Sequence, residues 1–152
     1  MIKVITLKEI TSDDPLIALI AYIHEHMPES YDAYYVTSEI EVMLRAESIR
    51  LLMQHNNDRI IVIEDAQLNA FIWFNIGEKT HIKSLYVQPD ERGKGYAHTL
   101  KRYVEKLSAC EGITYIYGHV DKNNHAMRKL NYKLGYRADD TLMYKHIEVP
   151  ND

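Results

Sequence analysis

The chain lacks the residues on which several protein classes depend. It has 152 residues and one cysteine, Cys110, which excludes an internal disulfide and a multi-cysteine metal site. No apolar run is long enough to span a bilayer, and the first residues lack the apolar core of a secretion signal. We therefore expect a cytoplasmic protein that does not associate with membranes. Cys110 lies near a predicted helix end on a partly apolar stripe, so we expect it in the core.

Strong charge and repetition are also missing. The net charge is −4, which argues against duplex nucleic acid as the main partner. There is no internal repeat, low-complexity segment or Gly/Ser-rich linker, so the length suits a single domain with one core. The eight histidines include no His-Glu-x-x-His run, and His24 and His26 cannot share a helix face. We expect no bound metal.

Hydrophobic periodicity predicts an α/β protein with the element order β-α-α-β-β-β-α-β-α-β. Antiparallel strands come first and a β-α-β unit follows, which favours a mixed, mostly antiparallel sheet with helices on both faces. Asp13 or Asp14 caps the first helix, and Ser38 with Glu41 forms a capping box for the second. The apolar stripe of that second helix is Ile40, Met43, Leu44, Leu51 and Leu52. Strands are predicted at 1–7, 59–64, 70–75, 81–87, 113–120 and 141–147. The first helix is predicted from about 15 to 26, the second begins at 38, and two more span 96 to about 110 and 124–134.

The most informative segment is Arg92-Gly93-Lys94-Gly95-Tyr96-Ala97, between a predicted strand and a periodic helix. Two close glycines let backbone amides turn outward at a helix N-terminus, where they bind phosphate oxygens, and Arg92 and Lys94 add positive charge. The segment therefore predicts a pyrophosphate site; the alternative is a plain turn with solvated side chains. A dinucleotide fingerprint needs a third glycine where His98 stands, and no P-loop sequence occurs.

Two motifs together resemble the GNAT superfamily of N-acetyltransferases. The glycine segment matches the family pattern Gln/Arg-x-x-Gly-x-Gly/Ala. Val120, Asn124 and the run from Leu130 to Tyr136 resemble the family's second motif. The motifs cover residues 81–136, and the predicted element order extends the resemblance to nearly the whole chain. The resemblance implies one N-acetyltransferase domain over 1–152, with its cofactor half at about 81–136.

The family resemblance implies acetyl-CoA as co-substrate. It implies that the pyrophosphate is held by amides of the glycine segment, that strand residues pair with the pantetheine arm, and that Asn124 bonds the same arm. The acetyl group would pass to a primary amine, on a small molecule or a peptide, by direct attack, in a monomer or homodimer. The alternative is a CoA-binding sensor or pseudoenzyme without turnover. The implied cofactor-binding residues are Leu85, Tyr86, Val87, Arg92, Gly93, Lys94, Gly95, Tyr96, Ala97 and Asn124.

The catalytic groups are less defined by the sequence. The attacking amine must lose a proton, and the candidates for the base are His81, His119, Tyr86 or a water between them. The family often has a tyrosine where this chain has Asn131, and Tyr132 follows it. One residue along a helix rotates a side chain by about 100°, so Tyr132, the remaining candidate acid, does not simply inherit that role.

The tyrosine-rich loop after the first predicted helix is the candidate acceptor site. The resemblance implies that this region covers the acceptor, and carboxylates with aromatic faces suit a cationic amine. The alternative is a solvated loop with packing tyrosines. The candidate acceptor-binding residues are Glu29, Tyr31, Asp32 and Tyr34.

Overall fold

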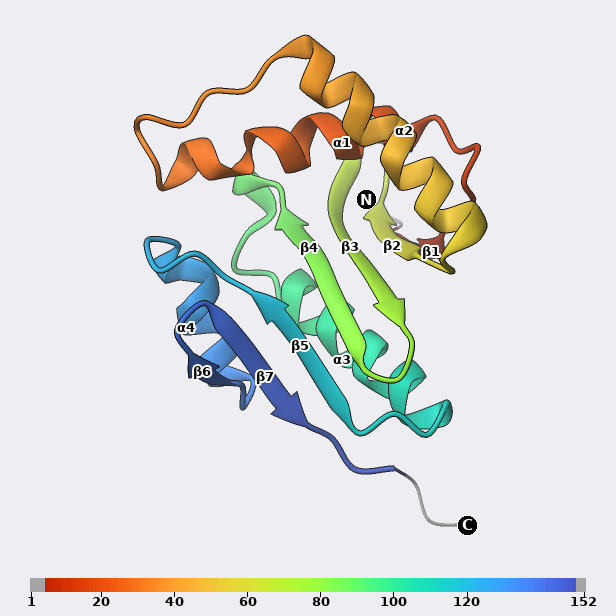
Figure 1. Ribbon diagram of the computed structural model, residues 1–152, viewed down its shortest axis with the longest axis vertical. Coiled ribbons are helices and arrows are strands. Elements are labelled where there is room, and N and C mark those ends of the chain that lie inside the picture. The colour runs from red at the N-terminus through yellow and green to blue at the C-terminus, as the bar shows by residue number, and fades with distance from the viewer. Residues whose placement is uncertain (1–4, 150–152) are drawn as a thin grey trace.

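The computed structural model describes residues 5–149 (Figure 1). The strands are β1 (Thr6–Glu9), β2 (Arg59–Glu64), β3 (Leu68–Ile76), β4 (Thr80–Val87), β5 (Tyr115–His119), β6 (Arg137–Asp139) and β7 (Leu142–His146). The α-helices are α1 (Leu16–His26), α2 (Glu39–His55), α3 (Tyr96–Cys110) and α4 (His125–Lys133), and short 3-10 helices span Met27–Ser30 and Pro89–Glu91.

The strands form one sheet in the order β1-β2-β3-β4-β5-β7-β6. Only β4 and β5 are parallel, and every other neighbouring pair is antiparallel. Helices cover both faces, with α1 and α2 on one and α3 and α4 on the other (Figure 1). The predicted α/β class and mixed, mostly antiparallel sheet are confirmed.

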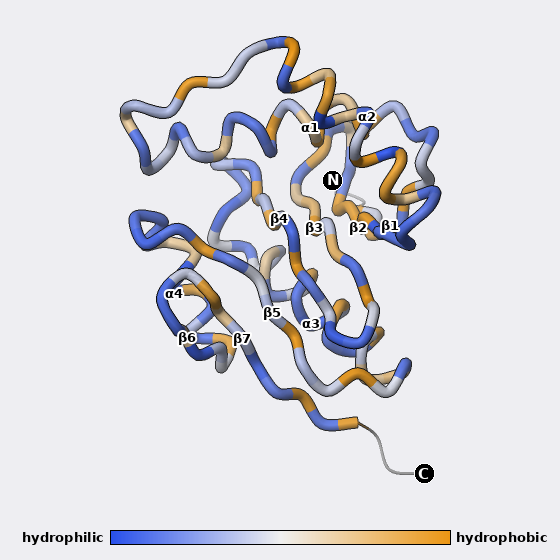
Figure 2. The backbone as a smooth tube through the Cα atoms, in the orientation of Figure 1, coloured by the Kyte–Doolittle hydropathy of each residue, from blue (hydrophilic) through white to orange (hydrophobic). Residues whose placement is uncertain are grey.

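Alternation along β3 builds two cores. Ala70, Ile72 and Phe74 are fully buried against the α3 side, whereas Phe71 and Trp73 are buried against α1 and α2. Successive strand side chains point to opposite faces, so a strand covered on both sides is apolar at nearly every position. Figure 2 shows this hydrophobic stretch in the middle of the sheet. No helix among residues 5–149 combines the length and apolar character that a membrane span requires.

Side chains cap three helices, those of α1 and α2 at predicted residues. The Glu41 carboxylate of the predicted capping box accepts a hydrogen bond from the Thr37 hydroxyl at 2.8 Å. The Asp14 carboxylate accepts a hydrogen bond from the Leu16 amide at 2.9 Å, and the Ser38 hydroxyl accepts one from the Glu41 amide at 3.3 Å. Each cap satisfies an amide that has no partner within its helix. Asn124 caps α4 in the same way, through its Oδ1 and an amide of the first turn.

The strand boundaries differ from prediction at both ends of the sheet. Part of the strand predicted at 1–7 lies outside the described residues, and β1 runs on to Glu9. The strand β6 was not predicted. It is three residues long, too short to show alternation, and it exists because it pairs with β7.

The stripe predicted on α2 is wrong for four of its five residues. Ile40, Met43 and Leu44 are 64–70% exposed and Leu51 is 46% exposed, whereas Leu52 packs partly buried against the core and Ile49 is fully buried. Cys110 is exposed, contrary to prediction, because it is the last residue of α3 and lies beyond the buried stripe.

The parallel pair β4 and β5 separates along its length. Their pairing consists of Thr80 with Ile116 and His81 with Tyr117. Gly118 follows, and a Cβ there would lie 2.8 Å from the carbonyl oxygen of Ile82. Only glycine therefore permits this backbone approach. Beyond it the two strands diverge (Figure 1), which leaves the edge of β4 that faces β5 open near its carboxyl end.

Candidate active site

The glycine segment forms a tight turn that leads into α3. Gly93 and Gly95 have φ angles of +83° and +86°, a conformation that glycine adopts without steric cost. Nothing lies within 4 Å of a Cβ built at either position. The turn therefore leaves its backbone accessible at the positive end of the α3 dipole, an arrangement suited to an anion.

Two basic side chains brace this turn. Arg92 Nε donates to the carbonyl oxygen of Val87 at 3.1 Å, which ties the turn to the end of β4. Lys94 Nζ lies 2.7 Å from the carboxylate of Glu91, itself a buried residue. Both cations remain beside the amides, so they add positive potential where an anion would sit.

A groove of about 800 Å³ runs from this turn along the open edge of β4. Its other wall comes from the end of α1 and the 3-10 helix that follows, including Tyr22, Ile23 and Met27. The groove brings together all the predicted cofactor-binding residues except Lys94: Leu85, Tyr86, Val87, Arg92, Gly93, Gly95, Tyr96, Ala97 and Asn124.

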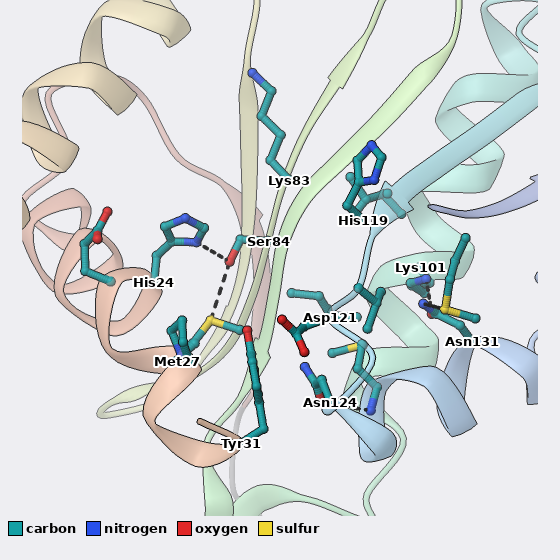
Figure 3. Close-up of a pocket in the computed structure, with 18 of the residues that line it drawn as sticks. His24, Met27, Tyr31, Lys83, Ser84, Lys101, His119, Asp121, Asn124 and Asn131 are labelled. Carbon is teal, nitrogen blue, oxygen red and sulfur yellow. Dashed lines mark hydrogen bonds between the residues drawn. The ribbon is translucent and has the colours of Figure 1, made fainter. Parts of the chain in front are cut away.

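A second cavity, of about 290 Å³, lies where β4 and β5 diverge (Figure 3). Side chains from α1, α2, α3, α4 and both strands meet here. Met27, Leu85, Asn124 and Met127 line both this cavity and the groove, so the two spaces meet at these residues. A molecule extended along the groove would present its end to the cavity.

The predicted catalytic residues separate into two groups. His119 lines the cavity and Tyr86 lines the groove, where burial raises the pKa of the Tyr86 hydroxyl. His81 and Tyr132 line neither space. His81 stacks on Tyr117 with ring centroids 4.6 Å apart, and burial lowers the pKa of its imidazole. Tyr132 is 53% exposed on α4.

The predicted acceptor residues also separate. Tyr31 lines the cavity, and burial followed by the nearby charge of Asp121 raises the pKa of its hydroxyl. Glu29 lines the groove and lies 2.7 Å from His26. Asp32 and Tyr34 line neither space, and Asp32 instead accepts a hydrogen bond from the Tyr34 amide at 3.0 Å.

His24 is a cavity residue that sequence reasoning did not select. Its Nδ1 lies 2.9 Å from the Ser84 hydroxyl (Figure 3), and its ring packs in a T-shaped arrangement with Trp73, with ring centroids 5.4 Å apart. Burial lowers the pKa of His24, and the charge of Arg45 lowers it further, so the ring is neutral near pH 7. The available signal was helical spacing, because His24 continues the buried face of Ile17, Ile20 and Ala21.

The cavity contains charges of both signs. Arg45 pairs with Glu25 at 2.5 Å, and Lys83 pairs with the fully buried carboxylate of Asp58 at 2.7 Å. Lys101 lines the inner part of the cavity beside Asn131. Within residues 5–149, no three His, Cys, Asp or Glu side chains gather closely enough to hold a metal ion.

Solved structures with this fold include GNAT acetyltransferases, some of them with CoA or acetyl-CoA bound. A Staphylococcus aureus protein described as a GNAT family acetyltransferase is 31% identical, with 72% of this chain and 96% of that chain covered and a TM-score of 0.66. The PaiA N-acetyltransferase of Thermoplasma acidophilum, solved with coenzyme A, is 22% identical over 94% and 99% of the two chains, at a TM-score of 0.71. YncA of Salmonella typhimurium, solved with acetyl-CoA, is 15% identical, with 97% of this chain and 95% of that chain covered and a TM-score of 0.69.

Among curated protein sequences, none matches this one. Residues 19–136, which run from α1 through the glycine turn to the end of the second motif, match the model of the Acetyltransferase (GNAT) family. The chain belongs to the GNAT family of acetyltransferases.

Proposed function

We propose that this protein transfers the acetyl group of acetyl-CoA to a primary amine, on a small molecule or a peptide, by direct attack. The observation that carries the proposal is the junction between groove and cavity at Met27, Leu85, Asn124 and Met127. A turn suited to phosphate at one end and a cavity lined by both polar and apolar side chains at the other suit a long donor whose reactive group lies at its tip.

The residues of the groove fit the donor's chemistry. The open space around Gly93 and Gly95 at the start of α3 gives a pyrophosphate room to approach the backbone amides of the turn. The open edge of β4 near Leu85 and Val87 offers backbone groups to an extended arm, as in strand addition. When bound, acetyl-CoA supplies a thioester whose acyl carbon accepts the amine.

The cavity residues would orient the amine and remove its proton. Holding both reactants together provides much of the rate in such a transfer. His24 is the best-supported base, because it is neutral and faces the cavity, and His119 lines the opposite side. Tyr31 and Asp121 offer an aromatic face and a carboxylate to a cationic acceptor before it is deprotonated.

Acetyl-CoA is expected to raise the melting temperature, whereas NADH is not. A ligand that binds only the native state at a hundredfold excess over its Kd stabilises by about 2.7 kcal/mol. For a domain of this size that corresponds to roughly 5–10 °C. Differential scanning fluorimetry with matched concentrations measures both ligands. An unchanged melting temperature at saturating acetyl-CoA would remove the basis of the proposal.

Turnover distinguishes the enzyme from a CoA-binding sensor. Release of the CoA thiol, followed with a thiol reagent across polyamines, amino acids and peptide N-termini, is expected with at least one amine class. A protein that binds acetyl-CoA tightly and releases no thiol above the uncatalysed rate with any of them is a sensor and not a transferase.

Tyr132→Phe is expected to change kcat by no more than about twofold. Tyr132 is half-exposed and lines neither space, and surface substitutions usually shift free energies by about 0.5 kcal/mol or less. Steady-state kinetics with intact acetyl-CoA binding checks this. A loss of several orders of magnitude would identify Tyr132 as the proton donor instead.

A further inference from the structure

Lys101 is an unusual residue for its position. It lies on α3 between Leu100 and Val104 of the core and is 3% exposed, yet it lines the cavity. Its Nζ donates a hydrogen bond to Asn131 Oδ1 (Figure 3) and lies 3.8 Å from the centre of the Tyr136 ring. Asn131 is itself buried, and its amide nitrogen lies 3.5 Å from the Met143 sulfur.

No carboxylate among the described residues forms an ion pair with Lys101. Glu105, one turn further along α3, is bound by Lys145 of β7 at 2.9 Å and by the Tyr136 hydroxyl at 3.5 Å. Burial lowers the pKa of Lys101 to about 7; the charge of Lys145 lowers it and that of Glu105 raises it. The ammonium therefore gives up its proton readily.

A buried lysine without a carboxylate partner destabilises the fold, and an apolar residue would suit this core position better. A buried ionisable side chain that destabilises the fold and lines a cavity is typical of functional sites. The chemistry of the proposed reaction gives the group a task. When the C–S bond of the thioester breaks, the departing sulfur carries negative charge and must gain a proton.

Four other donors around the cavity are less suitable for that task. Lys83 is held by Asp58, and the Arg45 guanidinium does not release a proton in proteins. Burial raises the pKa of the Tyr31 hydroxyl, which makes it a weaker acid, and His24 is neutral. Lys101 combines a labile proton with a place on the cavity wall, and its partner Asn131 lies one turn along α4 from Met127, where the cavity meets the groove.

We propose, building on the function above, that Lys101 protonates the sulfur of departing CoA and that Asn131 holds the ammonium in place. The amine nitrogen bonds to the acyl carbon and the C–S bond breaks. The electron pair goes to sulfur, and sulfur takes a proton from Nζ. The amine's own proton leaves to the base, and neutral Lys101 regains a proton from solvent for the next cycle.

Kinetics of Lys101→Met, Lys101→Arg and Lys145→Met test the proposal. Lys101→Met keeps the side-chain length and is expected to lower kcat by about 10²-fold with acetyl-CoA affinity unchanged. Lys101→Arg keeps the charge but cannot donate its proton, so it should be nearly as slow. Lys145→Met is the matched control, because Lys145 contacts the same Glu105 and Tyr136 but does not line the cavity.

The pH profile gives the sign of the proton transfer. If Lys101 is the acid, kcat of the wild type falls as pH rises through its pKa, and this descending limb is absent in Lys101→Met. In Lys145→Met the limb moves to higher pH, because a charge that lowers the pKa of Lys101 is gone. A limb that rises with pH and disappears in Lys101→Met would make Lys101 a base and overturn the assignment. A folded Lys101→Met with the kcat of the wild type would overturn it as well.

A binding measurement tests the contact without turnover. Calorimetry compares CoA with desulfo-CoA, which lacks only the sulfur. The wild type and Lys145→Met are expected to prefer CoA by about tenfold, and Lys101→Met to lose that preference. Equal preference in all three proteins would place Lys101 away from the sulfur. If the wild type shows the preference but turns over no amine, the proposed transferase function fails while the contact between Lys101 and the sulfur stands.

Discussion

Gly95→Val is expected to weaken acetyl-CoA binding by at least about a hundredfold while the protein still folds. Gly95 has a φ of +86° immediately before α3, a conformation in which a β-branched residue is strained by about 1–3 kcal/mol. Relief of that strain rotates the amides that face the groove. The added side chain also stands where nothing lies within 4 Å at present. Isothermal titration calorimetry measures the lost affinity.

The same helix provides a matched control for Gly95→Val. Gly112 follows the C-terminal end of α3 with a φ of +79° and equally open space around a Cβ, but it does not line the groove. Gly112→Val should therefore cost about as much folding free energy and leave acetyl-CoA affinity unchanged. If both variants lose stability and neither loses affinity, the role of Gly95 is limited to the shape of the chain.

The parts of this protein that the sequence predicted are those set by local spacing. The glycine segment and the periodic helix after it require only neighbouring residues, and α3 begins at Tyr96, directly after Gly95. The order of strands and helices follows equally from local periodicity. The exception is β6, whose three residues are a strand only because β7 lies beside them.

The cavity could not be predicted in the same way. Lys101 and Asn131 are thirty residues apart along the chain, and a lysine within an apolar stripe is ordinarily assigned to the surface. The sequence allowed His24 to be considered only as a metal ligand, because its neighbours Ser84 and Trp73 lie on strands that are far from it along the chain. Long-range contacts of this kind depend on strand register, which residue spacing within one element does not determine.

Asp58→Ala is expected to lower the free energy of unfolding by about 3–5 kcal/mol, the typical cost of removing one partner from a buried ion pair. Asp58 precedes β2, and its side chain is fully buried. The carboxylate accepts hydrogen bonds from Trp73 Nε1 at 2.8 Å, Lys83 Nζ at 2.7 Å, Asn56 Nδ2 at 2.9 Å and Asn75 Nδ2 at 3.1 Å. Alanine leaves these donors without that acceptor, and the Lys83 ammonium loses its counter-charge.

The exposed ion pair of Lys122 and Asp140 is the control for Asp58→Ala, because it has the same kind of charge pairing without burial. Their atoms lie 2.6 Å apart, but both side chains are more than half exposed, and such pairs contribute little to stability because solvent screens them. Urea denaturation should show a midpoint close to wild type for Lys122→Met and much lower for Asp58→Ala. Equal midpoints would mean that water reaches the Asp58 site.

Asp58→Ala is also expected to change the kinetics, because Lys83 lines the cavity and would lose its counter-charge there. The unpaired positive charge would repel a cationic acceptor, so the KM of the acceptor should rise more than the KM of acetyl-CoA.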